Sequence, residues 1–513
     1  MSTQIPTLSN EIAFVDAGVA DAASLVAKFK PGTEVHLLDS SQDAIAQITQ
    51  VLASRSNLSA VHLVSHGSNG ALQLGGETVD DLSEYDAELQ LWSNSLTAHA
   101  DILLYGCNVA AGNAGMVFAN SLAQLTGADV AASDDLTGLG GDWELEYSSG
   151  AIEAISLAAV DYTSTLANFT VTTLNDVVDA NDGVISLREA INVANNLDGT
   201  DNIFFAVNGT ITLTGGQLTI SSDLNIFGNG ASFTTISGNN ASRVFNVGSG
   251  TVLLSGLTIA NGRVTSDSGG GIRNNGTLTM QFCTLSGNSA VGGPGGGIEN
   301  LGTLTVNGSS FSNNSAIAAG GGGIENRSTL TVNHSSFSNN SADSGGGIRS
   351  DGTVTVNSTT FSGNSADFGG GIANRGTLTV NSSTFSNNSA DSGGGVYNLI
   401  GSLTVTGSYF RNNQATDGGG ISNRFGGTST LIANVISQNS ATNRGGGIFA
   451  DSGTVYLQLN NISFNTASTG TDLFGAVLSG TSTPGSVGFN VIGKGGGFTG
   501  ITNGVNGDVI LVP

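Results

Sequence analysis

An apolar residue recurs every 24 to 26 residues through the second half of the chain, always within the same local pattern. Segments such as FSNNSA and FSGNSA place it three positions before an asparagine. A GGGI-type turn and an alternating strand such as TLTV stand upstream of each. A repeat this short cannot bury an apolar face alone, so successive copies must stack. The apolar column is Leu285, Phe311, Phe337, Phe361, Phe385, Phe410, Ile436 and Ile462, and the asparagine column is Asn288, Asn314, Asn340, Asn364, Asn388, Asn413, Asn439 and Asn465.

The stacking of these repeats defines a fold. Each strand pairs with its copy in the next coil, about 4.8 Å away. The Ile, Leu or Val, and Phe positions then form interior columns, and the asparagine amides hydrogen-bond along the axis as in other amide ladders. We therefore predict an all-β right-handed parallel β-helix over residues 201–470, followed by an irregular C-terminal cap over residues 471–513.

Residues 10–150 have a different pattern, in which apolar runs of strand length alternate with helical patterns. This alternation predicts an α/β domain whose parallel sheet is covered by helices on both faces. The domain is assigned to residues 1–150, a linker to 151–170 and a capping segment to 171–200. The predicted strands are 12–15, 34–38, 60–65, 101–105 and 129–132, and the predicted helices are 20–29, 42–53 and 115–125.

The capping segment contains a predicted amphipathic helix. Ser186 and Glu189 form an S-x-x-E capping box. Leu187, Ala190 and Ile191 fall on one apolar helical face. A helix here covers the first coil of the β-helix and blocks edge-to-edge pairing.

Two regions of the β-helix half resemble known families. The GGGI and F-x-x-N motifs, over about residues 250–470, resemble the repeats of bacterial polymorphic outer-membrane proteins. That resemblance implies a β-helix and a surface adhesin. Residues 171–196 resemble the module named after the sequence CSLREA, with Ile185 in place of its cysteine.

Two dipeptides follow consecutive predicted strands of the α/β domain, His66-Gly67 and Gly106-Cys107, and their side chains converge if these strands are neighbours in the sheet. Ligand sites of open α/β sheets lie beyond the carboxyl ends of the strands. A thiol and an imidazole within reach of each other form the smallest nucleophile and base pair. Buried cysteines and strand-end histidines are also common without catalysis, so both interpretations stay open.

This arrangement resembles the caspase-like clan of cysteine peptidases (clan CD), which includes gingipains and separases. The resemblance implies that His66 is the general base, that Cys107 is the nucleophile and that Gly67 leaves room for an oxyanion donor. The longer pattern SHG…LLYGCNVAAG…GDWELE, over about residues 12–150, also resembles a domain of unknown function that opens many large secreted bacterial surface proteins.

The charge is strongly acidic and unevenly distributed. The formal net charge is −25, and residues 1–165 contribute 3 Lys or Arg against 21 Asp or Glu. This balance argues against nucleic acid and anionic membranes as partners. The N-terminus lacks a Sec-type signal pattern, and no apolar run approaches the roughly 20 residues of a membrane span. We expect a chain that is either cytoplasmic or exported to the surface without an N-terminal mark.

One acidic column is a candidate metal site. Asp343, Asp367 and Asp391 each lie five residues before the Ile or Val of a GGG turn. Stacked carboxylates repel unless a cation bridges them, so they are either solvated corner residues or a weak Ca²⁺ site. No other cofactor is expected. Catalysis by the β-helix is not expected, because the only lysine after residue 30 is Lys494 and no paired acidic cluster occurs in the repeats.

Three functions compete for this monomeric architecture. In the first, the β-helix is an adhesin or matrix element that binds glycans or proteins, and the N-terminal module processes the chain or assists its export. In the second, the module is a cysteine peptidase on a passive spacer. In the third, the β-helix binds or cleaves polysaccharide.

Overall fold

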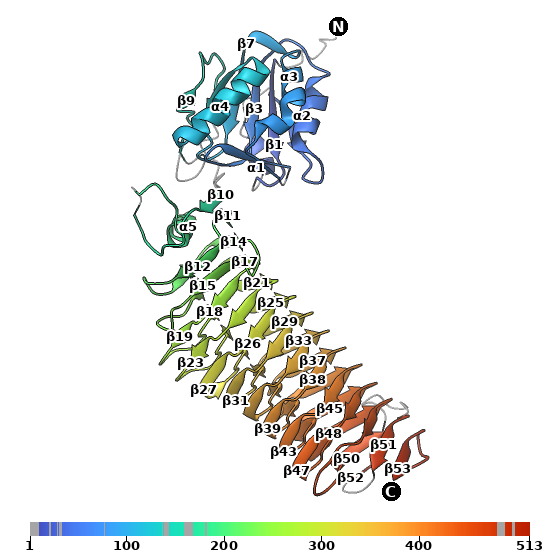
Figure 1. The fold of residues 1–513 in the computed structure, drawn as a ribbon. Helices are drawn as coiled ribbons and strands as arrows, with labels where there is room; N and C mark the ends of the chain where they lie inside the picture. Colours follow the sequence, from blue (N-terminus) through green and yellow to red (C-terminus); the bar gives the residue numbers. More distant parts are fainter. Residues whose placement is uncertain are drawn as a thin grey trace. The chain divides into compact units, whose positions relative to one another are not determined.

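The computed structural model resolves the chain into two compact units (Figure 1). The first unit is Met1–Thr170 with Asn192–Phe204, and the second is Val171–Ile191 with Phe205–Pro513. None of the helices in the described ranges has the length and apolar character of a membrane span. The structure describes residues 10–19, 22–27, 29, 33–75, 77–135, 137, 143–157, 168–179, 182–197, 199–479, 488–494 and 498–512.

A six-stranded sheet organises the first unit, in the order β2-β1-β3-β7-β8-β9. Strands β1, β2, β3, β7 and β8 are parallel. Strands β1 and β3 and the second half of β7 are buried along nearly their whole length, as expected for central strands covered on both faces. The predicted all-parallel sheet is wrong in one respect, because β9 pairs antiparallel with β8. That strand has only two residues and leaves no apolar run to detect. The strands are β1 (Glu11–Asp16), β2 (Glu34–Leu38), β3 (Leu58–Val64), β7 (Leu96–Tyr105), β8 (Asp129–Ala132) and β9 (Tyr147–Ser148).

Helices α2, α3 and α4 pack against one another and contribute to one apolar core. Ile48, Trp92 and Phe118 are buried in it. Asp43 caps α2 by accepting a hydrogen bond from the Ala46 amide at 2.9 Å. The helix α3, the turn η1 and a small antiparallel sheet were not predicted. The helices are α1 (Ala22–Val26), α2 (Ala44–Leu52), η1 (Leu82–Tyr85), α3 (Asp86–Trp92) and α4 (Gly112–Thr126), and the small sheet is β4 (His66–Ser68), β5 (Ala71–Leu74) and β6 (Glu77–Val79).

The second unit is a parallel β-solenoid. Each coil carries strands that pair in register with their copies in the next coil, so that Ile348 pairs with Ile372 and Phe337 with Phe361. In Figure 1 the repeated strands stack from green to red. Most coils contribute two strands to the longest sheet. From β13 on, its strands are β13 (Leu218–Ile220), β14 (Asp223–Phe227), β16 (Phe245–Val247), β17 (Thr251–Ser255), β20 (Ile272–Asn274), β21 (Thr277–Gln281), β24 (Ile298–Asn300), β25 (Thr303–Asn307), β28 (Ile324–Asn326), β29 (Thr329–Asn333), β32 (Ile348–Ser350), β33 (Thr353–Asn357), β36 (Ile372–Asn374), β37 (Thr377–Asn381), β40 (Val396–Asn398), β41 (Ser402–Thr406), β44 (Ile421–Arg424), β45 (Thr428–Ile432), β48 (Ile448–Gln458), β50 (Leu473–Ser479) and β52 (Phe498–Thr499).

Two further sheets complete the coils. The second sheet carries the Phe column, and the third carries the SAD-type segments that follow it. The second sheet comprises β12 (Gly209–Thr212), β15 (Thr234–Ser237), β18 (Thr258–Ala260), β22 (Thr284–Ser286), β26 (Ser310–Ser312), β30 (Ser336–Ser338), β34 (Thr360–Ser362), β38 (Thr384–Ser386), β42 (Tyr409–Arg411), β46 (Val435–Ser437), β49 (Asn461–Ser463), β51 (Val491–Lys494) and β53 (Val509–Val512). The third comprises β19 (Arg263–Val264), β23 (Ser289–Ala290), β27 (Ser315–Gly320), β31 (Ser341–Ser344), β35 (Ser365–Phe368), β39 (Ser389–Ser392), β43 (Gln414–Asp417) and β47 (Ser440–Arg444).

The predicted interior columns are confirmed. The five Phe rings from Phe311 to Phe410 are fully buried, with successive centroids 4.6 to 4.8 Å apart and ring planes within 9°. This spacing equals the separation of paired strands, so each ring packs on its copy in the next coil. The asparagine ladder is also confirmed, since its side chains are buried and hydrogen-bonded from coil to coil. A second buried column, which includes Asn300 and Asn326, was not predicted.

The capping segment forms the expected helix α5 (Leu187–Ala194), which follows strand β10 (Asn168–Val171) and precedes strand β11 (Thr200–Phe205) in the chain. The Ser186 amide donates to the Glu189 carboxylate at 2.8 Å, and the Glu189 amide donates to the Ser186 hydroxyl at 3.1 Å. This reciprocal pair is the predicted capping box. Residues 471–513, expected to be irregular, contain strands β50 to β53, which continue the coil stacking.

Candidate functional site

The two dipeptides singled out in the first unit lie side by side. Strands β3 and β7 pair in register through Val64 and Tyr105, and the Ser65 amide donates to the Tyr105 carbonyl at 3.1 Å. A Cβ on Gly67 would lie 2.7 Å from the carbonyl carbon of Gly106. The absence of a side chain at Gly67 therefore serves close packing of two backbones.

The side chains of these dipeptides hydrogen-bond in opposite directions. The Nε2 atom of His66 lies 3.1 Å from the carbonyl oxygen of Gly18, which follows β1. The Cys107 sulfur accepts from the Thr137 amide at 3.1 Å, and Thr137 follows β8. Strands β1 and β8 flank the β3–β7 pair on opposite sides, so the two side chains hydrogen-bond to segments that follow different neighbouring strands.

Burial bears on the chemistry of Cys107. Its exposed fraction is 0 %, and that of His66 is 4 %. Reactive cysteines are at least partly exposed, because a substrate must reach the sulfur. The Nδ1 atom of His66 is buried and has no hydrogen-bond partner among the described residues. The burial of Cys107 argues against a nucleophile in this conformation, and the proposed dyad stays a prediction.

The acidic column lies on exposed corners of the solenoid. Asp343, Asp367 and Asp391 belong to β31, β35 and β39 and are all exposed. Within the described residues, the one set of three carboxylates whose oxygens lie within 4.8 Å of one another is elsewhere, in the first unit. Calcium binding by the column stays a prediction.

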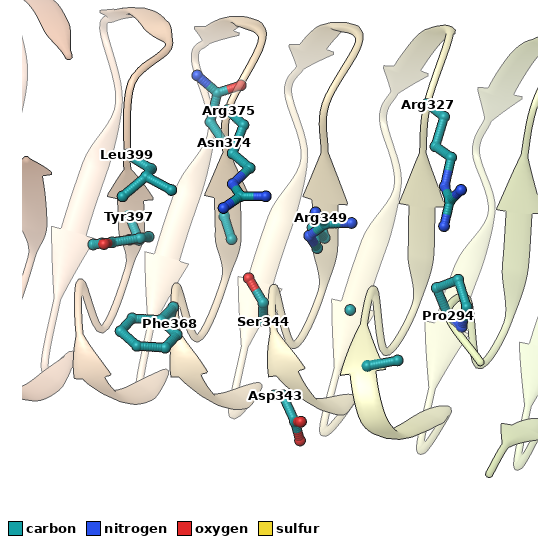
Figure 2. Close-up of a pocket in the computed structure, with 13 residues that line it drawn as sticks. Pro294, Arg327, Asp343, Ser344, Arg349, Phe368, Asn374, Arg375, Tyr397 and Leu399 are labelled. Atoms are coloured by element: carbon teal, nitrogen blue, oxygen red, sulfur yellow. The ribbon is translucent and has the colours of Figure 1, made fainter. Parts of the chain in front are cut away.

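A groove on the solenoid surface is a candidate ligand site that the structure adds (Figure 2). It has a volume of about 590 Å³, within the range of small-molecule sites. Its lining comes from strands β27, β31 and β35 of the third sheet, from strands β32, β36 and β40 of the longest sheet, and from residues next to these strands. Its lining is Pro294, Ala319, Gly320, Arg327, Asp343, Ser344, Arg349, Phe368, Ala373, Asn374, Arg375, Tyr397 and Leu399.

An aromatic pair forms one end of the groove. The rings of Phe368 and Tyr397 have centroids 5.2 Å apart and planes tilted by 37°. Phe368 is 42 % exposed, whereas Tyr397 is 6 % exposed, so Phe368 covers its partner and faces solvent. Burial raises the pKa of the Tyr397 phenol, which stays protonated and able to donate a hydrogen bond. The pair offers an apolar face beside a polar hydroxyl.

Three arginines from successive coils line the rest of the groove, as Figure 2 shows. Arg349 contacts Glu325 and lies 3.0 Å from the Asp351 carboxylate, and the Nε of Arg327 lies 3.6 Å from Glu325. Arg375 is exposed and forms no ion pair with any described residue. Arg375 is thus the guanidinium available to an anionic group of a ligand, while Arg349 is held by acidic neighbours.

The arginines of the groove were not predicted from the sequence. Arg327 and Arg375 stand three positions after the Ile of a GGGI turn, but Arg349 stands one position after it. Asp351 and Leu399 interrupt the column that holds Arg327 and Arg375, and Arg349 belongs to a different column, so strict periodicity does not reveal the cluster. The signal in the sequence is that the segments IENR (324–327), IRSD (348–351) and IANR (372–375) each carry an arginine shortly after the Ile of the turn. Stacked coils bring these segments to one surface even though the arginines occupy different positions in them.

Comparisons with known families match two parts of the chain. Residues 12–172 match the family described as Domain of unknown function (DUF4347). Residues 334–351 and 382–399 match the Chlamydia polymorphic membrane protein repeat, which agrees with the solenoid coils there. No curated protein matches the chain.

Proposed function

We propose that this chain is a bacterial surface or extracellular protein whose β-solenoid is an adhesive element that binds acidic glycans. The observation that carries the proposal is the groove in which the Phe368–Tyr397 pair stands beside Arg375. The two repeats similar to those of the Chlamydia polymorphic membrane protein support a surface location. In this proposal the first unit, a caspase-like module, serves export, processing or attachment, and the solenoid binds without catalysis.

The groove chemistry favours a saccharide over an apolar ligand. An aromatic face packs against the apolar C–H face of a sugar ring, and the Tyr397 hydroxyl has no partner among the described residues. An unpaired guanidinium recognises a carboxylate or sulfate through two parallel hydrogen bonds. Together these groups select a sugar that carries a negative charge.

A glycan array probed with the full chain tests this function. We expect acidic oligosaccharides to be retained, and we expect Tyr397→Ala to abolish retention while the solenoid stays folded. An equal signal from the variant, or retention of neutral glycans alone, would reject the groove as the binding site.

The second candidate function is that of a cysteine peptidase. The observation that favours it is the adjacency of the His66 and Cys107 backbones beyond the paired ends of β3 and β7. Against it stands the burial of the thiol. Labelling of Cys107 separates the two functions.

A further inference from the structure

Three carboxylates converge in the first unit, away from the strand ends discussed above. Asp101 in β7 and Asp129 at the start of β8 are register partners, and Glu153 lies in the segment after β9. One oxygen from each lies within 4.8 Å of the others. Asp101 is fully buried, Asp129 is half-buried and Glu153 is exposed.

No positive side chain among the described residues balances this cluster. Asp101, Asp129 and Glu153 form no ion pair with a described residue, in contrast to Glu34, which contacts Arg55. Like charges at this separation repel, which disfavours three ionised groups unless something neutralises them. Convergence of this kind alone does not establish a site.

Asp101 supplies an independent observation. Its Oδ2 atom accepts hydrogen bonds from the amides of Glu153 at 2.9 Å and Ala154 at 2.7 Å. Its Oδ1 atom is fully buried and has no hydrogen-bond partner in the described part of the chain. Leaving a buried carboxylate oxygen without a partner is costly, so its presence points to a missing ligand.

We propose that Asp101, Asp129 and Glu153 bind one Ca²⁺ ion. Two oxygens bonded to the same ion at about 2.4 Å are at most about 4.8 Å apart, which the cluster meets. Mg²⁺ holds its ligands at about 2.1 Å in strict octahedral geometry and suits this span less well. Zn²⁺ favours nitrogen and sulfur, whereas all three ligands here are carboxylates. Water completes the coordination on the exposed side of Glu153.

The ion has a structural consequence. It ties β7 and β8 to the segment that contains Glu153, which two amide hydrogen bonds already hold against Asp101. A Cβ on Gly150 would lie 1.9 Å from Oδ1 of Asp129, so Gly150 makes room for that carboxylate. Calcium therefore stabilises the folded first unit by mass action, and its melting temperature rises with Ca²⁺ concentration.

Titration of the chelator-treated full chain with Ca²⁺ tests the site. Isothermal calorimetry is expected to give one Ca²⁺ per chain at this site, with a Kd on the order of 10⁻⁴ to 10⁻³ M or tighter. Asp129→Asn is expected to weaken this binding at least about tenfold and to remove the Ca²⁺-dependent rise in melting temperature. Without Ca²⁺, the same variant melts at or above the wild-type temperature, because one repelling charge is gone.

Two controls keep the outcome specific. Glu84→Gln makes the same charge change on an exposed turn and should leave Ca²⁺ binding intact, and Asp367→Asn separates any contribution of the solenoid column. Glu153→Gln should reproduce Asp129→Asn if the latter folds poorly. Wild-type protein without heat or melting shift at about 5 mM Ca²⁺, or Asp129→Asn that binds like wild type, would overturn the proposal.

Discussion

The Oδ1 atom of Asn364 accepts two hydrogen bonds from Asn340, one from its backbone amide and one from its Nδ2, both at 3.0 Å. Asn364 makes the same pair of donations to Asn388, at 3.0 and 2.9 Å, and its Nδ2 also donates to the Phe337 carbonyl at 3.0 Å. Every polar atom of the buried amide is thereby satisfied. The ladder fixes the register between coils because a shifted coil would leave these groups unpaired.

Removing one asparagine side chain from the ladder should be strongly destabilising. We predict that Asn364→Ala lowers local stability by about 2–4 kcal/mol, because the backbone amide and the Nδ2 of Asn340 both lose their acceptor. Native-state hydrogen exchange of β34 and β38 measures this loss. The matched control is Asn357→Ala, which breaks a ladder on the outer surface at Asn333 and Asn381 and should cost less than about 1 kcal/mol. Equal losses of stability in the two variants would show that burial of the asparagine side chain does not contribute.

Truncating a ring of the Phe column should leave a cavity and destabilise the coil. Phe361→Ala should destabilise its coil by about 3–5 kcal/mol, since the ring is fully buried between Phe337 and Phe385. Phe368→Ala removes the same side chain from a 42 % exposed position and should cost about 1 kcal/mol or less. Urea-dependent hydrogen exchange compares the two variants. A similar loss in both would mean that the column does not form the core.

Glu325 predicts a pH dependence of local stability. Burial raises its pKa from the ordinary value near 4.5 to about 7, despite the opposing effect of Arg349 and Arg327. A raised folded pKa stabilises the fold below pH 4.5, and this contribution is lost as the pH rises to about 7. Exchange protection of β28, corrected for intrinsic rates, should fall by up to about 3 kcal/mol across that range. Glu325→Gln should flatten the profile, whereas protection that rises with pH in the wild type would show that Arg349 outweighs burial.

The thiol of Cys107 is predicted to be unreactive in the native chain. In a Cys283→Ala background it is the only thiol, and its labelling by a maleimide should be as slow as local unfolding because the sulfur is fully buried. Rapid labelling that disappears in His66→Ala would instead establish the dyad and favour the peptidase. In that case Cys107→Ala should abolish any cleavage without unfolding the module.

The sequence predicted what repeats and what is continuously apolar. The Phe361 and Asn364 columns could be assigned because each buried position recurs at nearly constant spacing. Strands β3 and β7 could be assigned because Val61 and Ile102 lie in strand-length runs of mostly apolar residues. The side-chain directions of His66 and Cys107 could not be predicted, because they depend on hydrogen bonds to Gly18 and Thr137, which are far away in the sequence.

The groove escaped prediction for a different reason. Outward-facing positions are free to vary between coils: Arg349 and Tyr397 stand in one column with Ala373 between them, and Arg375 stands in another. No column keeps one side-chain chemistry, although these residues share a surface. The carboxylates of Asp101 and Glu153 are likewise 52 residues apart and meet only after folding.

The groove is proposed to bind an acidic sugar through Arg375 and the aromatic pair. The most direct measurement is calorimetric binding of a uronic-acid trisaccharide and of its neutral methyl ester to the full chain and to Arg375→Gln. The wild type should bind the acid at least about tenfold more tightly than the ester, a difference of about 1.4 kcal/mol, and the variant should bind the two alike. Equal affinity of the wild type for acid and ester, or unchanged discrimination in Arg375→Gln, would contradict the account.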